Sequence, residues 1–384
     1  MVNKNICDDE DRYQLQTYGK FPISIDSAKG CYVYDGEGKK YLDFYSGHAV
    51  TSTGHCHPHV VKAIQQQTSR LLFYSNVVYS KVRARAAKKL VEMAGSPYYQ
   101  AFFVNSGSEA NENAIKLVRA VTERREIISA VGSFHGRTYG ALSSTGIPEY
   151  SKYLNTPVPM HRVLPIDDIP KSISMDTAAV LIEPIQSMAG VKEVPLIALK
   201  EIAEACHKNG AALIFDEVQT GAGRTGSFLF SGQDDVYADI VTLAKGIASG
   251  FPAGALLLTE VLAKKVQKGD LGTTFGGGPL ACAALEATLA VIDEEELAAN
   301  AARKGAHLKQ ALSTIPGILE VRGRGLLLGL KSKAGRTAKD LQNSLFNQGI
   351  LTGTSHDPQV LRLMPPLILD QVEADIFVEA LKRT

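Results

Sequence analysis

Short, mainly apolar runs alternate with longer helix-forming stretches through the middle of the chain. The runs have the length and composition of buried strands, and they fall at 101–105, 127–131, 211–215 and 239–244. Helical patterns, such as the one at 112–121, lie between them. From about residue 58 to residue 274 the pattern is therefore βαβα. It predicts an α/β fold with a mostly parallel sheet and helices on both of its faces.

The two ends of the chain predict a smaller α+β unit. Residues 31–44 form two alternating runs about a Gly-rich turn, which indicates a hairpin. Beyond residue 275, helical and strand patterns follow one another at 281–293, 297–312, 319–322 and 326–330. We expect the N-terminal hairpin to join this unit. The predicted parts are an N-terminal segment, a large domain and a small domain, at 1–57, 58–275 and 276–384.

Composition narrows the class of protein. The chain has 384 residues, enough for two or three compact units, and a net charge of +1. That balance gives no electrostatic reason to expect a nucleic acid or a membrane surface as partner. No apolar run reaches the ~20 residues of a membrane span, and the N-terminal residues lack a signal-peptide core. Five scattered cysteines do not suggest a disulfide framework, so we expect a cytoplasmic protein.

The strongest chemical signal stands at the ends of two predicted strands. Asp216 follows the run at 211–215, and Lys245 follows the run at 239–244. Ligands of open α/β sheets bind at the carboxyl ends of the strands. A carboxylate there can keep a pyridine nitrogen protonated, and a desolvated lysine can form a Schiff base with an aldehyde. Taken alone, Asp216 is an ordinary turn cap and Lys245 a surface lysine; together they indicate pyridoxal 5'-phosphate (PLP) as cofactor.

A third strand leads into a possible phosphate site. Residues 101–105 run into Ser106, Gly107 and Ser108, and a helical pattern follows. Backbone N–H groups at a helix start, with serine hydroxyls beside them, bind anions. A plain helix N-cap is the alternative for the same residues.

Further residues fit around such a cofactor. Phe134 follows the run at 127–131, so it can cover one face of the ring while Val218 covers the other. Arg137 offers a planar pair of donors to a substrate carboxylate. The loop at 272–278 supplies hydroxyls and bare backbone for a second phosphate contact.

Three motifs point elsewhere and are better explained structurally. The GxGxxG match at 221–226 is followed by no helix start, which favours a loop over a dinucleotide site. The His-Cys-His-Pro-His run at 55–59 places neighbouring side chains in different directions, so we expect no metal site. The acidic run at 293–296 is best read as a solvated helix junction.

The motifs taken together resemble the class III aminotransferases of PLP fold type I. The similarity extends from about Phe21 to Leu381, and the ordered motifs that carry it lie at 105–112, 134–138, 183–186, 216–219, 243–246 and 274–277. The resemblance implies that Lys245 carries the cofactor and moves the proton, that Asp216 pairs with the ring nitrogen, and that Gln219 approaches the ring hydroxyl.

The resemblance also implies the remaining contacts. Gly107, Ser108 and, from a neighbouring subunit of a homodimer, Thr274 would hold the phosphate. Arg137, Thr273 and Arg362 are expected on the substrate, and Glu183 behind the cofactor. The full set expected on the cofactor is Ser106, Gly107, Ser108, Phe134, His135, Glu183, Asp216, Glu217, Val218, Gln219, Lys245 and Thr274.

The reaction that the resemblance implies moves the δ-amino group of an N-acylated ornithine to 2-oxoglutarate, giving the semialdehyde and glutamate, as in arginine biosynthesis. Whether the acyl group is acetyl or succinyl stays open. Another ω-aminotransferase, acting on 4-aminobutyrate, ornithine or lysine, or an aminomutase would use the same motifs. A binding protein without turnover and a nicotinamide dehydrogenase are the alternatives from other classes; intact Lys245 and Asp216 argue against the first, and the misplaced GxGxxG against the second.

The chain departs from its relatives at one place. After the run at 183–186 the family usually continues Gly-Glu, and that glutamate is thought to pair with Arg362; this chain has Ser187 and Met188. A methionine cannot neutralise a guanidinium. Arg362 should therefore stay open to carboxylates or find another acidic partner, unless Met188 only fills a gap in the packing.

Overall fold

The computed structural model describes residues 2–152 and 154–384. Its centre is a seven-stranded sheet in the order β4-β12-β11-β10-β7-β5-β6. The strands in that order are Tyr98–Val104, Gly254–Thr259, Ile240–Leu243, Ala212–Asp216, Thr177–Ile182, Glu126–Ala130 and His161–Leu164. All run parallel except β12, which is antiparallel to both of its neighbours. The predicted mostly parallel sheet is confirmed; β12 lies in a region where we predicted no strand.

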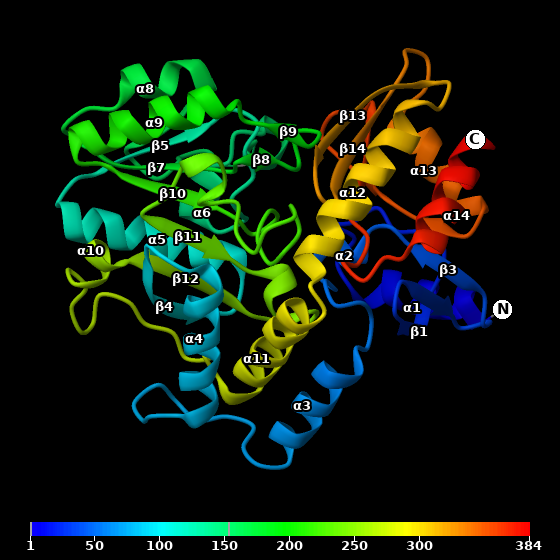
Figure 1. Cartoon of the computed structure of the whole chain (residues 1–384), viewed down its shortest axis with the longest axis horizontal. Helices are drawn as coiled ribbons and strands as arrows, with labels where there is room; N and C mark the ends of the chain where they lie inside the picture. Colours follow the sequence, from blue (N-terminus) through cyan, green and yellow to red (C-terminus); the bar gives the residue numbers. More distant parts are fainter. Residues whose placement is uncertain (1, 153) are drawn as a thin grey trace.

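Helices cover both faces of this sheet (Figure 1). One face packs against α5, Gly107–Thr122, and the other against α9, Leu196–Asn209, together with α4, Lys81–Ala94, and α11, Pro279–Glu294. Successive side chains of a strand point to opposite faces. In β10, Ile214 accordingly lies in the core under α5, whereas Phe215 lies in the core under α9.

The segments from the two ends of the chain lie together, blue beside orange and red in Figure 1. One four-stranded sheet joins β1, β2 and β3 (Ile25–Lys29, Tyr32–Asp35 and Lys40–Asp43) to β15 (Ile350–Leu351). A second contains β13, β14, β17 and β16 (Ile318–Arg324, Leu327–Ser332, Val360–Leu363 and Gly353–Thr354). The helices here are α12, α13 and α14 (Leu297–Ser313, Ala338–Asn347 and Gln371–Lys382). The hairpin and its pairing with the C-terminal part are as expected, while the three domain boundaries stay a prediction.

Shorter elements complete the chain. The helices are α1 (Val2–Tyr13), α2 (Ser46–Ala49), α3 (Pro58–Thr68), α6 (Tyr139–Ser143), α7 (Pro148–Ser151), α8 (Ile169–Ser172) and α10 (Glu260–Ala263). The 3₁₀ turns are η1 (Ile166–Asp168), η2 (Gln233–Asp235) and η3 (Lys245–Ala248), and β8 (Ile185–Gln186) pairs with β9 (Lys192–Glu193). Within the part of the chain that the structure describes, no helix is long and apolar enough to cross a membrane.

The structure also settles three local predictions. The helix expected at 112–121 begins earlier, at Gly107, because the Ser106 hydroxyl caps it by accepting the N–H of Glu109 at 3.1 Å. The GxGxxG segment is a series of turns with no helix after it. In the 55–59 run, His55 contacts Asp43 at 2.7 Å and His57 contacts Glu295 at 3.1 Å. These two histidines therefore contact different carboxylates.

Candidate active site

A cavity of about 430 Å³ opens at the carboxyl ends of the parallel strands. The predicted residues that line it are Ser106, Gly107, Ser108, Phe134, His135, Arg137, Glu183, Asp216, Val218, Gln219 and Lys245. They come from the loops that follow β4, β5, β7, β10 and β11. Parallel strands bring these loops to one edge of the sheet, which is why residues so far apart in sequence meet here.

Asp216 is buried at the end of β10, and its carboxylate is held from three directions. Oδ2 accepts hydrogen bonds from Asn111 Nδ2 and His135 Nδ1, both at 2.8 Å, and Oδ1 accepts the N–H of Val218 at 3.1 Å. Hydrogen bonds of this kind favour the ionised form of a carboxylate. A carboxylate that already accepts three hydrogen bonds still has a free acceptor position for a group in the cavity.

Lys245 begins the η3 turn directly after β11 and has a φ of 48°. A non-glycine residue in this left-handed region is uncommon and is typically held by its surroundings. Burial lowers the pKa of Lys245 to about 8, although the charges of Asp216 and Glu183 act to raise it. Its amine is thus far more often neutral near pH 8 than an ordinary lysine amine, and a neutral amine is a nucleophile.

The N-terminus of α5 forms one wall of the cavity. Ser108 Oγ accepts the N–H of Arg137 at 3.1 Å and so ties this wall to the loop after β5. Gly107 lies directly against Val218: a Cβ on Gly107 would come within 2.8 Å of a Val218 methyl carbon. Only glycine therefore fits at this position without displacing Val218.

Glu183 lies behind the cavity and is almost fully buried. Its carboxylate accepts the N–H groups of Phe134 at 2.7 Å and of Ser187 at 3.4 Å. Burial, and then the charge of Asp216, raise the pKa of Glu183 well above its usual range. Glu183 therefore fixes the backbone on which Phe134 is carried.

Aromatic residues and Arg137 form the rim. The ring of Phe134 meets the ring of Tyr150 edge to face at 5.2 Å. The guanidinium of Arg137 lies over the Tyr150 ring, 4.2 Å from its centroid. Stacking holds the arginine at the mouth of the cavity and leaves its edge donors available for a carboxylate.

Four predicted residues do not line this cavity: Glu217, Thr273, Thr274 and Arg362. Glu217 follows Asp216 on the strand, so its side chain points to the opposite face and accepts the N–H groups of Phe230 and Ser231. This corrects the expectation that Glu217 faces the cofactor. Thr273 and Thr274 lie in the loop before α11 and do not line the cavity of their own chain; Thr273 Oγ1 accepts the N–H of Gly276 at 3.0 Å.

Arg362 is buried in β17, beside rather than on the cavity wall. Its Nε donates to the carbonyl of Thr354 at 2.7 Å, and its Nη1 donates to Ser187 Oγ at 3.0 Å. Among the described residues no carboxylate lies within ion-pair distance of it. The alternative of a new acidic partner is thus not seen, and Met188 lines the cavity nearby.

Sequence reasoning gave no role to several residues of the site. Asn111 and Thr242 hydrogen-bond beneath Asp216, and Tyr150 and His48 line the cavity. Burial, with the charges of Arg362 and Lys245, lowers the pKa of His48 to about 4. No sequence signal pointed to Thr242, because its place beside Asp216 depends on the register of two parallel strands.

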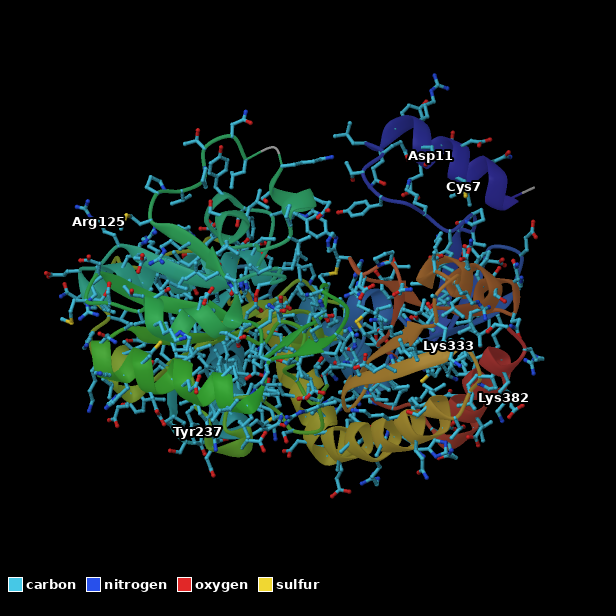
Figure 2. All side chains as sticks on the ribbon, turned by 90° about the horizontal axis from the view of Figure 1, so that it is seen from above. Cys7, Asp11, Arg125, Tyr237, Lys333 and Lys382 are labelled. Carbon is cyan, nitrogen blue, oxygen red and sulfur yellow. The ribbon has the colours of Figure 1, made fainter. Side chains whose placement is uncertain are left out.

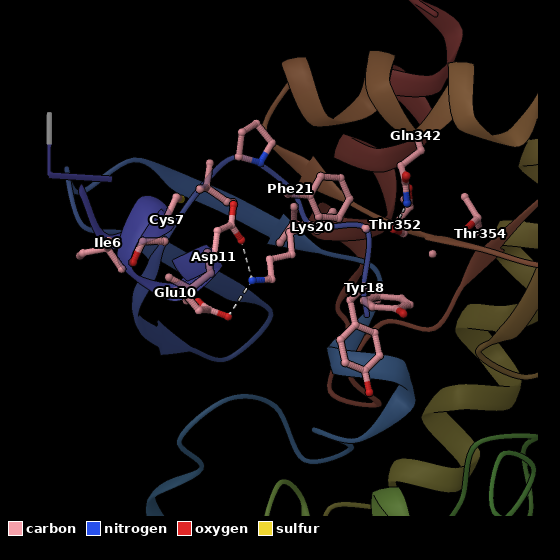
Figure 3. Close-up of a pocket in the computed structure, with 18 of the residues that line it drawn as sticks. Ile6, Cys7, Glu10, Asp11, Tyr18, Lys20, Phe21, Gln342, Thr352 and Thr354 are labelled. Atoms are coloured by element: carbon pink, nitrogen blue, oxygen red, sulfur yellow. Dashed lines mark hydrogen bonds and ion pairs between the residues drawn. The ribbon is translucent and has the colours of Figure 1, made fainter. Parts of the chain in front are cut away.

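A larger cavity, about 1140 Å³, lies between α1 and the C-terminal sheet (Figure 3). On the α1 side of this cavity, Lys20 forms ion pairs with Glu10 at 3.2 Å and with Asp11 at 3.0 Å. The helix itself stands out from the rest of the chain (Figure 2). The two cavities share Tyr18 and His48 as lining residues, so the N-terminal segment borders the mouth of the smaller one.

Comparison with known proteins identifies the family of the chain. The family model "Aminotransferase class-III" matches residues 13–384. The acetylornithine aminotransferase of Methanopyrus kandleri is 43% identical over 95% of both chains, and that of Methanocaldococcus jannaschii is 40% identical over 99% of this chain and 98% of its own.

Solved structures show the same fold. The ornithine aminotransferase of Toxoplasma gondii superposes with a TM-score of 0.93 at 30% identity, covering 100% of this chain and 94% of its own. The acetylornithine aminotransferase of Elizabethkingia anophelis gives 0.86 at 28% identity, covering 99% and 98%. These aminotransferases have PLP fold type I. With the family model spanning all but its first residues, the chain belongs to the class III aminotransferases.

Proposed function

We propose that this aminotransferase binds PLP through Lys245 and transfers the δ-amino group of an N-acylated ornithine to 2-oxoglutarate. The carrying observation is the meeting of three features in one cavity: a lysine whose pKa is lowered, a hydrogen-bonded carboxylate at a strand tip, and a helix N-terminus. The acetylornithine aminotransferases, about 40% identical over nearly the full length, support this donor.

The residues present fit PLP. The N-terminus of α5 suits a phosphate, and Gly107 lets the backbone come close to it. Among the described residues, Gln219 Oε1 and His135 Nε2 are buried without a hydrogen-bond partner, and both belong to residues that line the cavity. Buried polar atoms are normally satisfied, so a ligand is the natural partner for these two. When bound, the cofactor supplies an electron-withdrawing ring that stabilises negative charge on the substrate carbon.

The protein's own groups then have separate tasks. Lys245 would bind the cofactor through its neutral amine and would carry a proton between neighbouring atoms. Asp216 would hold a proton on the ring nitrogen. Phe134 and Val218 would shield the ring from water, and Glu183 holds the loop of Phe134 in place.

Substrate carboxylates have two candidate partners. Arg137 lies at the rim, where it can bind a carboxylate far from the reacting amine. Arg362 is buried, and in the part of the chain that the structure describes its hydrogen bonds go to two neutral acceptors. A buried guanidinium without a counter-ion favours an anion, which suits the carboxylates of 2-oxoglutarate and glutamate.

We also propose a homodimer that completes the site. Exposed apolar side chains gather about the loop before α11, and Phe73 contacts Phe275 with ring centroids 5.3 Å apart. The exposed members are Leu71, Leu72, Phe73, Tyr74, Val77, Val78, Tyr79 and Phe275. An apolar patch of this kind favours burial against a partner. A second copy seated here would use Thr273 and Thr274, which lie in the same loop.

A panel of half-reactions tests the function. The PLP-loaded enzyme is mixed in turn with N-acetylornithine, N-succinylornithine, ornithine, lysine and 4-aminobutyrate, and its yellow colour is followed. We expect an N-acylated ornithine to bleach it fastest and 2-oxoglutarate to restore it. The Lys245→Ala variant is the control and should not complete the cycle. Faster bleaching by 4-aminobutyrate or free lysine would replace the proposed donor with that amine.

A further inference from the structure

We propose that Asn111 and Thr242 are positioning residues that hold the Asp216 carboxylate turned toward the cavity. The inference rests on the proposed function, because Asp216 acts there on the cofactor ring. Neither side chain needs to touch a ligand for this role. Thr242 has no exposed surface and is not among the residues that line the cavity.

The register of the sheet brings the three residues together. Asp216 of β10 and Thr242 of β11 pair directly across two parallel strands. Ile214 and Ile240 stand two residues earlier on these strands, and both lie in the core under α5. Because side chains two apart share a face, Asp216 and Thr242 also face α5, where Asn111 lies in the second turn.

The hydrogen bonds fix the orientation of the Asn111 amide. Its Nδ2 donates to the His135 carbonyl at 2.7 Å and to Asp216 Oδ2 at 2.8 Å, while its Oδ1 accepts the Thr242 hydroxyl at 2.7 Å. The reversed amide would set its oxygen against two acceptors. In the observed orientation the Thr242 hydroxyl donates to the Asn111 oxygen, so it acts on Asp216 through Asn111.

This arrangement decides which oxygen of Asp216 is available. Asn111 and His135 occupy Oδ2, and the Val218 N–H takes one position on Oδ1. The other ionisable groups around Asp216 are Glu183, Glu217 and Lys245. The hydrogen bonds from Asn111, His135 and Val218 therefore fix the direction in which the Asp216 carboxylate points.

The test uses the pH dependence of the visible band of the PLP-loaded enzyme. If the Asp216 carboxylate is held less firmly, it binds the ring N–H less well, and the ring nitrogen loses its proton more readily. Loss of that positive charge would raise the proton affinity of the Schiff-base nitrogen on Lys245. We expect Asn111→Leu to raise the pH midpoint of the visible band by about one unit. A shift of this size corresponds to the free energy of one hydrogen bond to a charged group. Thr242→Val should raise it less, and Thr242→Ser should restore the wild-type midpoint.

A matched control is Thr259→Val. Thr259 ends β12 of the same sheet, and among the described residues its buried hydroxyl has no partner. The visible band of the Thr259→Val variant should have the same pH midpoint as that of the wild-type enzyme. Both half-reactions should slow by the same factor in Asn111→Leu and Thr242→Val, with KM for each substrate unchanged, because the effect passes through the ring.

Two results overturn the inference. One is a wild-type midpoint in Thr242→Val with PLP bound, which decides the matter even when Asn111→Leu does not fold. The other is an equal shift in Thr259→Val, which would indicate a general disturbance of the sheet. A wild-type enzyme that never forms the visible band refutes the proposed cofactor role itself, so the two failures are distinguishable.

Discussion

Replacing Gly107 by alanine should weaken PLP binding while leaving the apoenzyme stable. The added Cβ would lie 2.8 and 3.0 Å from the two methyl carbons of Val218 and 3.5 Å from Cβ of Ala244. Carbon atoms in contact prefer about 3.5 to 4.0 Å, so Val218 must move by several tenths of an ångström. Without cofactor it can move into the cavity. With cofactor bound, the ring that Val218 is proposed to cover blocks that movement.

The size of the effect follows from the packing clash. Overpacking a well-filled site costs about 1 to 3 kcal/mol. A change in helix propensity at residue 107 applies to the apoenzyme and the loaded enzyme alike, so it cancels from the affinity for PLP. Because only the loaded form carries the clash, we expect PLP to bind about 10- to 30-fold more weakly, a loss of about 1.4 to 2 kcal/mol.

The assay is a titration of apoenzyme with PLP, together with thermal unfolding of the apoenzyme. Val218→Ala removes the atoms that the new Cβ would strike, so Gly107→Ala should have little further effect in that background. Gly19→Ala serves as control, because no atom lies within 4 Å of the position of its added Cβ. If Gly107→Ala lowered the affinity for PLP equally in the wild-type and the Val218→Ala background, the reasoning would be refuted.

The other predictions concern catalysis, pH and assembly. Asp216→Asn should fold and bind PLP but lose a factor of ~100 or more in kcat, because an amide cannot keep the ring nitrogen protonated; a near-normal rate would remove Asp216 from this role. Capture of PLP by the apoenzyme should accelerate as pH rises, with a midpoint near 8, since only the neutral amine of Lys245 attacks and its pKa is lowered to about 8; a midpoint above 10 in stopped-flow absorbance contradicts this. Met188→Glu should weaken glutamate and 2-oxoglutarate by about fivefold or more, the effect of ~1 kcal/mol from a competing ion pair with Arg362; unchanged glutamate kinetics would show that position 188 does not face Arg362. Dilution should abolish activity as dimers separate, because Thr274 is proposed to act across the interface, and a fully active monomer at nanomolar concentration in sedimentation and rate measurements would exclude shared sites.

The sequence by itself determined the fold class and most of the cavity wall. Asp216 and Lys245 were recognisable because each ends an apolar run, and parallel strands gather such ends at one edge of the sheet. The serine-glycine turn at 106–108 was readable for a similar reason, since a polar turn between a strand and a helix makes both a cap and an anion site. These features depend on residues close together in sequence.

The tertiary structure alone decided how distant segments meet. The hydrogen bonds from Thr242 to Asn111 to Asp216 require the register between β10 and β11 and the packing of α5 on both. Ser187, directly after β8, contacts Arg362 only because the sheet that contains β17 lies beside it. The antiparallel strand β12 was likewise not predicted. The composition of a short apolar run does not determine whether it pairs parallel or antiparallel with its neighbours. Local composition sets which element forms, whereas long-range packing sets which polar groups are satisfied and by whom.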